Sequence, residues 1–332
     1  MLLKVENFGK NTYHFSNMVF AIYQIIRTAR PRQWLKNLSL FAAPLFTGML
    51  LSDHTFDLAV KAFFAFCALS SGAYFINDII DAPRDRLHPI KKNRPIASGK
   101  LSVGLAAIVA FILIFGALAG SAFYIGSFYT LALIVYVFIQ LAYSLYFRNV
   151  IILDSLVVAS GFVLRVFAGG LASNTSVSSW LALTTIGVSL LLAFGKRRSE
   201  KTIMAKYALD QEQGNTRKTL RHYPDNLLDS MISMSAAYTI ITYSMFVFQI
   251  SPQNISADLA NFLPSILKSP RWMMLTIPFV IYGVARYLYV VYEKGEGESP
   301  ERVLLSDKPL LTAVVLWGLV TVAIMFLLPY VG

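Results

Sequence analysis

Residues 57–85 read DLAVKAFFAFCALSSGAYFINDIIDAPRD, an apolar segment that ends in a cluster of acidic side chains. Its apolar part, 57–78, is long enough to cross a hydrocarbon layer of about 30 Å as a helix, at a rise of about 1.5 Å per residue. Backbone N–H and C=O groups in lipid must be satisfied within the segment, and the window is longer than a barrel strand needs. We therefore predict a transmembrane helix over 57–78 with the acidic cluster at one end.

The composition extends this prediction to the whole chain. Of its 332 residues, 56% are hydrophobic and 14% are charged, whereas a soluble domain has about 25% charged residues. We predict an all-α membrane protein, a bundle of nine transmembrane helices in a single polytopic domain, 1–332. The single cysteine, Cys67, excludes a disulfide framework. The predicted spans are 35–52, 57–78, 103–123, 127–147, 151–172, 179–195, 230–250, 272–292 and 309–330.

Lys and Arg residues gather on one side of this predicted topology. They concentrate in the N-terminal segment 1–32 and in the connections 79–102 and 196–229. Because basic connections stay in the cytoplasm, we expect these three segments there and the C-terminus outside, in an inner or plasma membrane. The N-terminal segment is polar and basic, so we expect no cleaved signal peptide. For most of these cations, holding topology and contacting anionic lipid headgroups is a sufficient role, and we expect no nucleic-acid partner.

Three carboxylates, Asp78, Asp81 and Asp85, stand at positions i, i+3 and i+7. On a helix they fall within about 60° of one another, although Pro83 leaves open whether Asp85 shares that helix. Like charges this close repel unless a cation lies between them, and acids oppose the dipole at a helix C-terminus. Mg²⁺ is usually bound by one or two carboxylates together with substrate phosphate oxygens. The cluster therefore predicts a magnesium-bound diphosphate; the alternative is a solvated helix end paired with neighbouring cations.

The pattern NDxxDxxxD, formed by Asn77 and the three aspartates, resembles that of the UbiA superfamily of intramembrane prenyltransferases. Nine spans with long connections after the second and sixth agree with it, so the resemblance covers nearly the whole chain. It implies a helical bundle that opens laterally to lipid, with Asp78, Asp81 and Asp85 as metal ligands holding Mg²⁺ against a diphosphate.

Four further stretches resemble the decaprenyl-phosphate phosphoribosyltransferase branch of that superfamily. They are RPRQWLKN (30–37), HPIKKNRPIA (88–97), RVFAGG (165–170) and GKRRSE (195–200). The resemblance implies transfer of a phosphoribosyl group from phosphoribosyl diphosphate to a polyprenyl (decaprenyl) phosphate, with release of diphosphate, for synthesis of cell-envelope polysaccharide precursors. Lipid chain length and oligomeric state stay open.

One departure from the superfamily concerns the segment after the sixth span. Aromatic prenyltransferases have a second aspartate motif there, whereas this chain has GKRRSE, with one acid and three cations. The next acids at comparable spacing, Asp225 and Asp229, follow Pro224 and suit the positive end of a helix dipole. We interpret these two aspartates as the start of the seventh span.

The balance of charges favours the phosphoribosyl reaction. Its donor and acceptor carry three anionic groups, which require more cations than a prenyl diphosphate does, and Arg and Lys suit phosphate oxygens. A lipid phosphate is largely dianionic at neutral pH, so no strong general base is needed. Glu200 is either a partner of nearby cations or a metal or ribose ligand. The candidate substrate-binding residues are Lys36, Asn37, Asn77, Arg84, Lys91, Arg94, Tyr143, Arg148, Lys196, Arg197 and Glu200.

Charges inside the spans cost about 2.5–3.5 kcal/mol each and must face the bundle interior. We expect Asp154 to touch the active cavity. Arg165 lies deeper in the same span, and we expect it to have a structural partner such as the carbonyls of another span. The role of Arg286 in the eighth span stays open. The alternative functions are prenyl transfer to an aromatic acceptor and, less favoured, transport of a phosphorylated lipid. A transporter is expected to place charges near the midplane in two repeat halves, whereas these carboxylates cluster at one face.

Overall fold

The computed structural model describes residues 19–87, 91–208, 223–251, 271–295, 297 and 299–327. Parts of four predicted segments lie outside this range: residues 1–18 of the N-terminal segment, 88–90 and 209–222 of the two basic connections, and the end of the last span. The described residues form helices and no strands. The all-α prediction is therefore confirmed for the described part of the chain.

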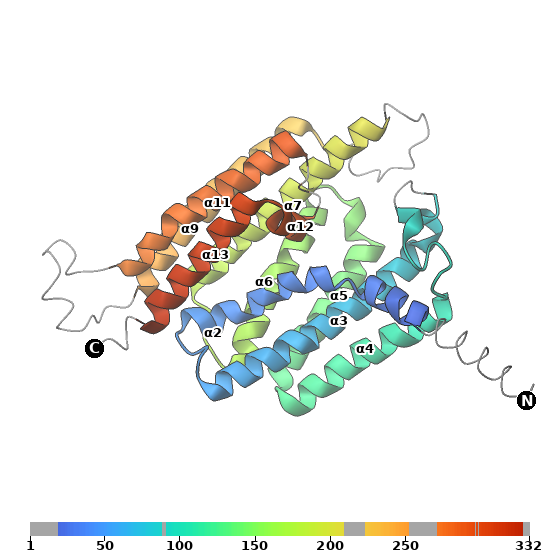
Figure 1. The fold of residues 1–332 in the computed structure, drawn as a ribbon, viewed down its shortest axis with the longest axis horizontal. Coiled ribbons are helices and arrows are strands. Elements are labelled where there is room, and N and C mark those ends of the chain that lie inside the picture. The colour runs from blue at the N-terminus through green and yellow to red at the C-terminus, as the bar shows by residue number, and fades with distance from the viewer. Residues whose placement is uncertain are drawn as a thin grey trace, which may run out of the picture.

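The described residues form ten labelled α-helices and a further helix, Val19–Ala29, with short 3₁₀ and π segments between the helices (Figure 1). The labelled α-helices are α2 (Ala42–Phe46), α3 (Asp53–Asp85), α4 (Val103–Tyr124), α5 (Ser127–Leu145), α6 (Leu153–Ser173), α7 (Ser179–Ala208), α9 (Asp225–Ile250), α11 (Ile277–Tyr289), α12 (Pro300–Ser306) and α13 (Lys308–Val322). The 3₁₀ segments are η1 (Pro31–Phe41), η2 (Lys91–Asn93), η3 (Phe147–Asn149) and η5 (Trp272–Thr276), and the π segments are η6 (Val290–Lys294) and η7 (Ala323–Leu327).

Eight helical segments in the described range are long and apolar enough to cross a membrane. They correspond to the predicted spans from 57–78 onward. Large apolar side chains such as Phe111, Phe115 and Phe123 are exposed on them, which suits a surface that faces lipid. The chain is thus a multi-pass membrane protein.

The first predicted span, 35–52, is not one continuous α-helix. It consists of η1, which starts earlier at Pro31, and the short helix α2, and it ends before Gly48, whose φ is 71°. Pro44 has no amide hydrogen to donate to the Leu40 carbonyl, so regular α-helical bonding is interrupted at this point. The predicted bundle of nine transmembrane helices is thus closely matched, with eight of the nine spans formed by helical segments long enough to cross a membrane in the described range.

Pro83 does not end α3, which continues to Asp85. All three aspartates therefore belong to one helix, and the question of where Asp85 lies is settled. The connection 196–229 is also partly helical, because α7 extends to Ala208 and α9 begins at Asp225.

Small residues on α6 allow η1 to pack closely at the centre of the bundle. Figure 1 shows α9, α11 and α13 grouped on one side and α3 and α4 on the other, with α2 and α6 between them. Ala168, Gly169 and Ala172 of α6 are buried, as is typical where membrane helices approach closely. The ideal Cβ position at Gly169 lies 1.9 Å from the Leu40 carbonyl oxygen, the same carbonyl that Pro44 leaves without an i+4 donor.

We predict that Gly169→Ala destabilises the protein, because the added methyl group collides with the backbone of η1. Overpacking of this kind costs about 1–3 kcal/mol or more. The matched control is Gly120→Ala in α4, where nothing lies within 4 Å of the new Cβ. Thermal unfolding in detergent should show a lower midpoint for Gly169→Ala only; equal midpoints for both variants would contradict the packing described here.

Candidate functional site

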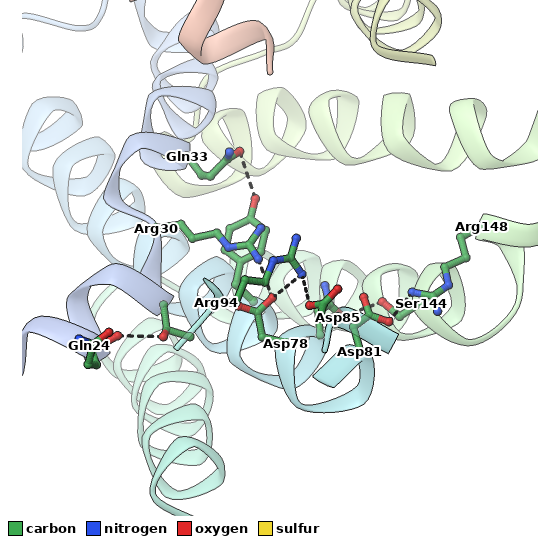
Figure 2. A network of polar contacts seen from close by, with 12 residues as sticks. Gln24, Arg30, Gln33, Asp78, Asp81, Asp85, Arg94, Ser144 and Arg148 are labelled. Carbon is green, nitrogen blue, oxygen red and sulfur yellow. Dashed lines mark hydrogen bonds and ion pairs between the residues drawn. The ribbon is translucent and has the colours of Figure 1, made fainter. Parts of the chain in front are cut away.

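The acidic end of α3 is neutralised by arginines from other parts of the chain. Asp78 and Asp85 are 3% and 5% exposed. Nη1 of Arg94 donates to both, at 3.1 Å to Asp78 Oδ1 and 2.7 Å to Asp85 Oδ2. Figure 2 shows Arg94 between these two aspartates, with Asp81 directed toward Arg148. The helix therefore keeps its three acids together because separate cations balance their charges.

Arg30 is a second cation on Asp78, and the sequence analysis did not include it among the site residues. Its Nη2 lies 2.5 Å from Asp78 Oδ1, and its guanidinium lies 4.9 Å from the centre of the Tyr74 ring. The Arg30 backbone has φ 55° and ψ 62°, a left-handed conformation that is uncommon for a residue other than glycine. The signal in the sequence was its place at the start of the RPRQWLKN stretch.

Asp81 and Asn77 connect α3 to the end of α5 and to η3. Arg148 Nη1 donates to Asp81 Oδ1 at 2.7 Å, and the Ser144 hydroxyl donates to Asn77 Oδ1 at 2.6 Å. The structure therefore brings the predicted residues Asn77, Asp81 and Arg148 together. Arg84 is exposed beside them, and Lys91 is half-buried on η2.

The oxygen ligands of these carboxylates are of the type that a magnesium ion prefers. Their arrangement in the structure, however, is not that of a formed metal site. Mg²⁺ prefers hard oxygen ligands and commonly takes only one or two from the protein. Asp78 and Asp85 face the same nitrogen of Arg94, so the pair is placed to share a cation. Within the described residues, no group of three His, Cys, Asp or Glu side chains is close enough to hold a metal. The predicted three-aspartate site stays a prediction, and an ion held by Asp78 and Asp85 requires Arg94 to move aside.

A second charge network lies around Arg197, whose side chain is 1% exposed. Its Nε lies 2.6 Å from Asp154 Oδ2, its Nη1 donates to Glu200 at 2.6 Å, and its Nη2 donates to the Tyr143 hydroxyl at 2.9 Å. Glu200 also lies 3.9 Å from Lys196. The predicted residues Tyr143, Lys196, Arg197 and Glu200 thus come together. Of the two interpretations of Glu200, the structure supports the role of a partner to cations.

Asp154 is the acid that balances Arg197, a pairing that the sequence analysis missed. The Tyr223 hydroxyl donates to Asp154 Oδ1 at 2.6 Å. Burial and the neighbouring carboxylate raise the pKa of Tyr223 to about 12, so this hydroxyl keeps its proton at neutral pH. The signal in the sequence was an acid inside a predicted span and a group of cations just after the sixth span, but spacing did not show which charges meet.

Asp225 and Asp229 stand in the first turns of α9, in agreement with their interpretation as the start of a span, and they also contact cations of α7. Asp229 accepts a hydrogen bond from Arg198 at 2.9 Å, and Asp225 lies 2.9 Å from Lys201. These contacts join the end of α7 to the start of α9.

Arg286, which the sequence left open, forms a two-pronged pair with Asp307 at 2.9 and 3.0 Å. Hydrogen bonds from Arg286 and Lys294 hold the pKa of Asp307 well below its usual range. This pair joins α11 to the start of α13.

Asn37 belongs to a buried hydrogen-bond network around Arg165. Asn37 is fully buried, and its Oδ1 accepts from Arg165 Nε at 2.8 Å. Arg165 also donates to the Gly161 carbonyl and to the Tyr136 hydroxyl, and its guanidinium lies 4.9 Å from the Phe66 ring centre. The partners of Arg165 are structural, as expected, but the carbonyl belongs to its own helix, and its contacts with other segments are the side chains of Asn37 and Tyr136. For Asn37, the contact shows a role in holding η1 against α6, and its predicted substrate contact stays untested.

Lys36 meets an acid that lies far away in the sequence. Its Nζ lies 3.2 Å from Oε2 of Glu301, in the first turn of α12, and Gln33 donates to the other oxygen of the same carboxylate. Gln33 Oε1 in turn accepts from the Tyr74 hydroxyl at 3.4 Å. Nothing in the local pattern around residue 301 singled out this glutamate.

Residues 41–306 match the model of the UbiA prenyltransferase family. The chain belongs to this family. The decaprenyl-phosphate phosphoribosyltransferase of Corynebacterium glutamicum is 33% identical over 309 residues, which are 92% of this chain and 87% of the relative. That of Mycolicibacterium smegmatis is 33% identical over 309 residues, covering 91% of this chain and 92% of the relative.

The same fold occurs in a solved UbiA homolog from Archaeoglobus fulgidus bound to GPP and Mg²⁺. Its TM-score is 0.62 at 20% identity, over 91% of this chain and 99% of that chain. The UbiA fold predicted from the aspartate pattern is thereby confirmed.

We predict that Asp154→Asn destabilises the bundle, because the buried Arg197 loses its fully buried carboxylate partner and keeps only the less buried Glu200 among the described residues. Removing one member of a buried pair costs about 3–5 kcal/mol. The control is Lys61→Gln, which breaks the exposed Lys61–Asp57 pair and should change stability by no more than about 1 kcal/mol. Unfolding in mixed micelles measures both; an Asp154→Asn protein as stable as the wild type would refute the buried pairing.

Proposed function

We propose that this protein transfers a phosphoribosyl group from phosphoribosyl diphosphate to a polyprenyl phosphate such as decaprenyl phosphate. The observation that carries the proposal is the excess of cations around the aspartates at one end of a membrane bundle. Relatives 33% identical over most of their length are named for the same reaction. The UbiA family supplies the membrane setting, in which a lipid acceptor reaches the site from the bilayer.

In the proposed reaction, the bond between C1 of the ribose and the diphosphate oxygen breaks, and an oxygen of the lipid phosphate forms the new bond to C1. Diphosphate leaves with the electron pair of the broken bond. No proton has to be removed from the acceptor, because a phosphate monoester is already ionised at neutral pH. The residues of the chain therefore bind and orient two anionic substrates and exclude water.

Asp78 and Asp85 are the residues that would hold Mg²⁺, with Asp81 beside them. When bound, the ion neutralises charge on the leaving diphosphate, which contributes several kcal/mol at a transition state. Arg94 and Arg30 become phosphate ligands in this proposal. Each guanidinium exchanges an aspartate for a phosphate oxygen as the donor enters, so no charge in the site is left unbalanced.

The orientation of the protein forms part of the proposal. The donor is a soluble, highly charged molecule, so the aspartates, the N-terminal segment 1–32 and the connections 79–102 and 196–229 face the cytoplasm. The excess of Lys and Arg in these segments supports this orientation.

Prenyl transfer to an aromatic acceptor is the second candidate function, since the solved homolog binds a prenyl diphosphate. Purified protein with Mg²⁺, polyprenyl phosphate and labelled phosphoribosyl diphosphate separates the two. We expect labelled lipid with this donor. Product from prenyl diphosphate and an aromatic acid, with no labelled lipid from the pentosyl donor, would overturn the proposal.

We predict that Asp78→Asn and Asp81→Asn each lower turnover by at least about 100-fold, because each removes charge needed at the leaving diphosphate. Chelation of divalent ions should abolish turnover of the wild type. Asp57→Asn on the same helix, in an exposed pair, should keep full activity and serves as the control. Membrane insertion should be unchanged in all three variants, and full activity of both aspartate variants or in chelator would remove the metal assignment.

We also predict that Arg94→Gln raises the KM for the donor by about tenfold or more, because a charge-assisted phosphate contact is lost. Initial rates at varied donor concentration give KM and kcat separately. If Arg94 serves only to neutralise Asp78 and Asp85, the variant will lose stability while the donor KM stays unchanged. Arg271→Gln, at a cation outside this site that donates to the Phe248 carbonyl, is the control for loss of a positive charge.

A further inference from the structure

Glu301 of α12 reaches the polar site from the last third of the chain. It is 7% exposed, and its carboxylate faces η1, where it meets Gln33 and Lys36. A carboxylate has two oxygens with about four acceptor positions, and these two partners occupy only part of them. The side chain is therefore held in place while keeping some acceptor capacity.

Contacts connect this carboxylate to the aspartates of α3. Gln33 accepts a hydrogen bond from the Tyr74 hydroxyl. The guanidinium of Arg30 lies over the Tyr74 ring and forms a salt bridge with Asp78. Glu301 consequently belongs to the same site as the aspartates and is not part of a separate pair on the surface.

A buried hydroxyl group beside the start of the GKRRSE stretch is a second observation. Tyr287 is 5% exposed, and its hydroxyl has no hydrogen-bond partner among the described residues. The hydroxyl lies against Gly195, the residue before Lys196. Buried hydroxyls are normally hydrogen-bonded, so this group points to a polar ligand.

We propose that Glu301, together with Gln33 and Tyr287, binds the hydroxyl groups of the donor sugar. This inference rests on the proposed function and deepens it, because it assigns the part of the site that distinguishes a sugar from a prenyl chain. Phosphates would be repelled by a carboxylate, whereas a neutral hydroxyl donates a charge-assisted hydrogen bond to it. Acidic side chains bind ribose hydroxyls in this way in dinucleotide-binding folds.

The same arrangement accounts for selection against prenyl diphosphate. A prenyl chain has no hydroxyl, so it would leave the Glu301 carboxylate and the Tyr287 hydroxyl buried against hydrocarbon. Sites built to hydrogen-bond a substrate hydroxyl strongly reject the analogue that lacks it, because their own polar groups are left unpaired. Lys36 alone does not give this selectivity, since both donors are diphosphates.

The test compares phosphoribosyl diphosphate with its 2-deoxy and 3-deoxy analogues, using the full chain with polyprenyl phosphate in lipid nanodiscs. We expect the wild type to prefer the ribosyl donor over at least one analogue in kcat/KM. Glu301→Gln should reduce that preference by about tenfold or more. The ratio is independent of the folded fraction, so partial misfolding does not affect it.

Two further variants separate sugar binding from a structural role. Glu301→Asp keeps the charge beside Lys36 but withdraws the carboxylate, so the preference should also fall. Glu293→Gln, at an exposed glutamate on η6, should keep the preference of the wild type. If Glu301→Gln and Glu301→Asp slow all donors by the same factor, Glu301 is only a counter-ion for Lys36 and the inference is wrong.

A binding measurement keeps this inference distinct from the proposed reaction. Thermal stabilisation of the wild type by phosphoribosyl diphosphate should exceed that by inorganic diphosphate, and Glu301→Gln should remove the difference. Equal stabilisation of the wild type by both ligands would overturn the inference whether or not transfer occurs. A clear difference in binding with no transfer to lipid would instead overturn the proposed reaction alone.

Discussion

Charge neutralisation at one end of a membrane bundle is the constraint on which the rest of this structure depends. Desolvated carboxylates and guanidiniums are costly unless each has a partner of opposite charge. The three aspartates of α3 meet this requirement through arginines from three different segments: Arg30 before η1, Arg94 after η2 and Arg148 in η3. Each pair also fixes the position of a segment, so the charges that form the site assemble the surrounding chain.

The same constraint explains why residues of similar type have different roles. Arg197 has a full set of buried partners in Asp154, Glu200 and Tyr143. Arg94 and Arg30 retain about a quarter of their side-chain exposure, 27% and 28%. A cation that is fully enclosed by protein partners stabilises the bundle, whereas a partly exposed one is able to exchange its partner for a phosphate group. The substrate-binding role proposed for Arg94 and Arg30 follows from this difference.

The interruption of the first helix is equally tied to the site. Since η1 replaces a regular span, Gln33, Lys36 and Asn37 are presented from one short segment to α12 and α6. The close contact between Gly169 and the Leu40 carbonyl and the Arg165–Asn37 hydrogen bond hold that segment against the bundle. The positions of the polar side chains of η1 therefore depend on the close packing of the small residue Gly169 of α6 against the same segment.

The sequence by itself determined the membrane class, eight of the spans and the clustering of the aspartates, including the family that this pattern resembles. These features are local: a span needs a sufficient run of apolar residues, and positions 78, 81 and 85 share a face through helix geometry alone. Only the tertiary structure decided which arginine meets which aspartate, that Asp154 balances Arg197, and that Glu301 reaches Gln33 from 268 residues away. Partners of this kind are selected by the packing of whole helices in three dimensions, which spacing along the chain does not encode.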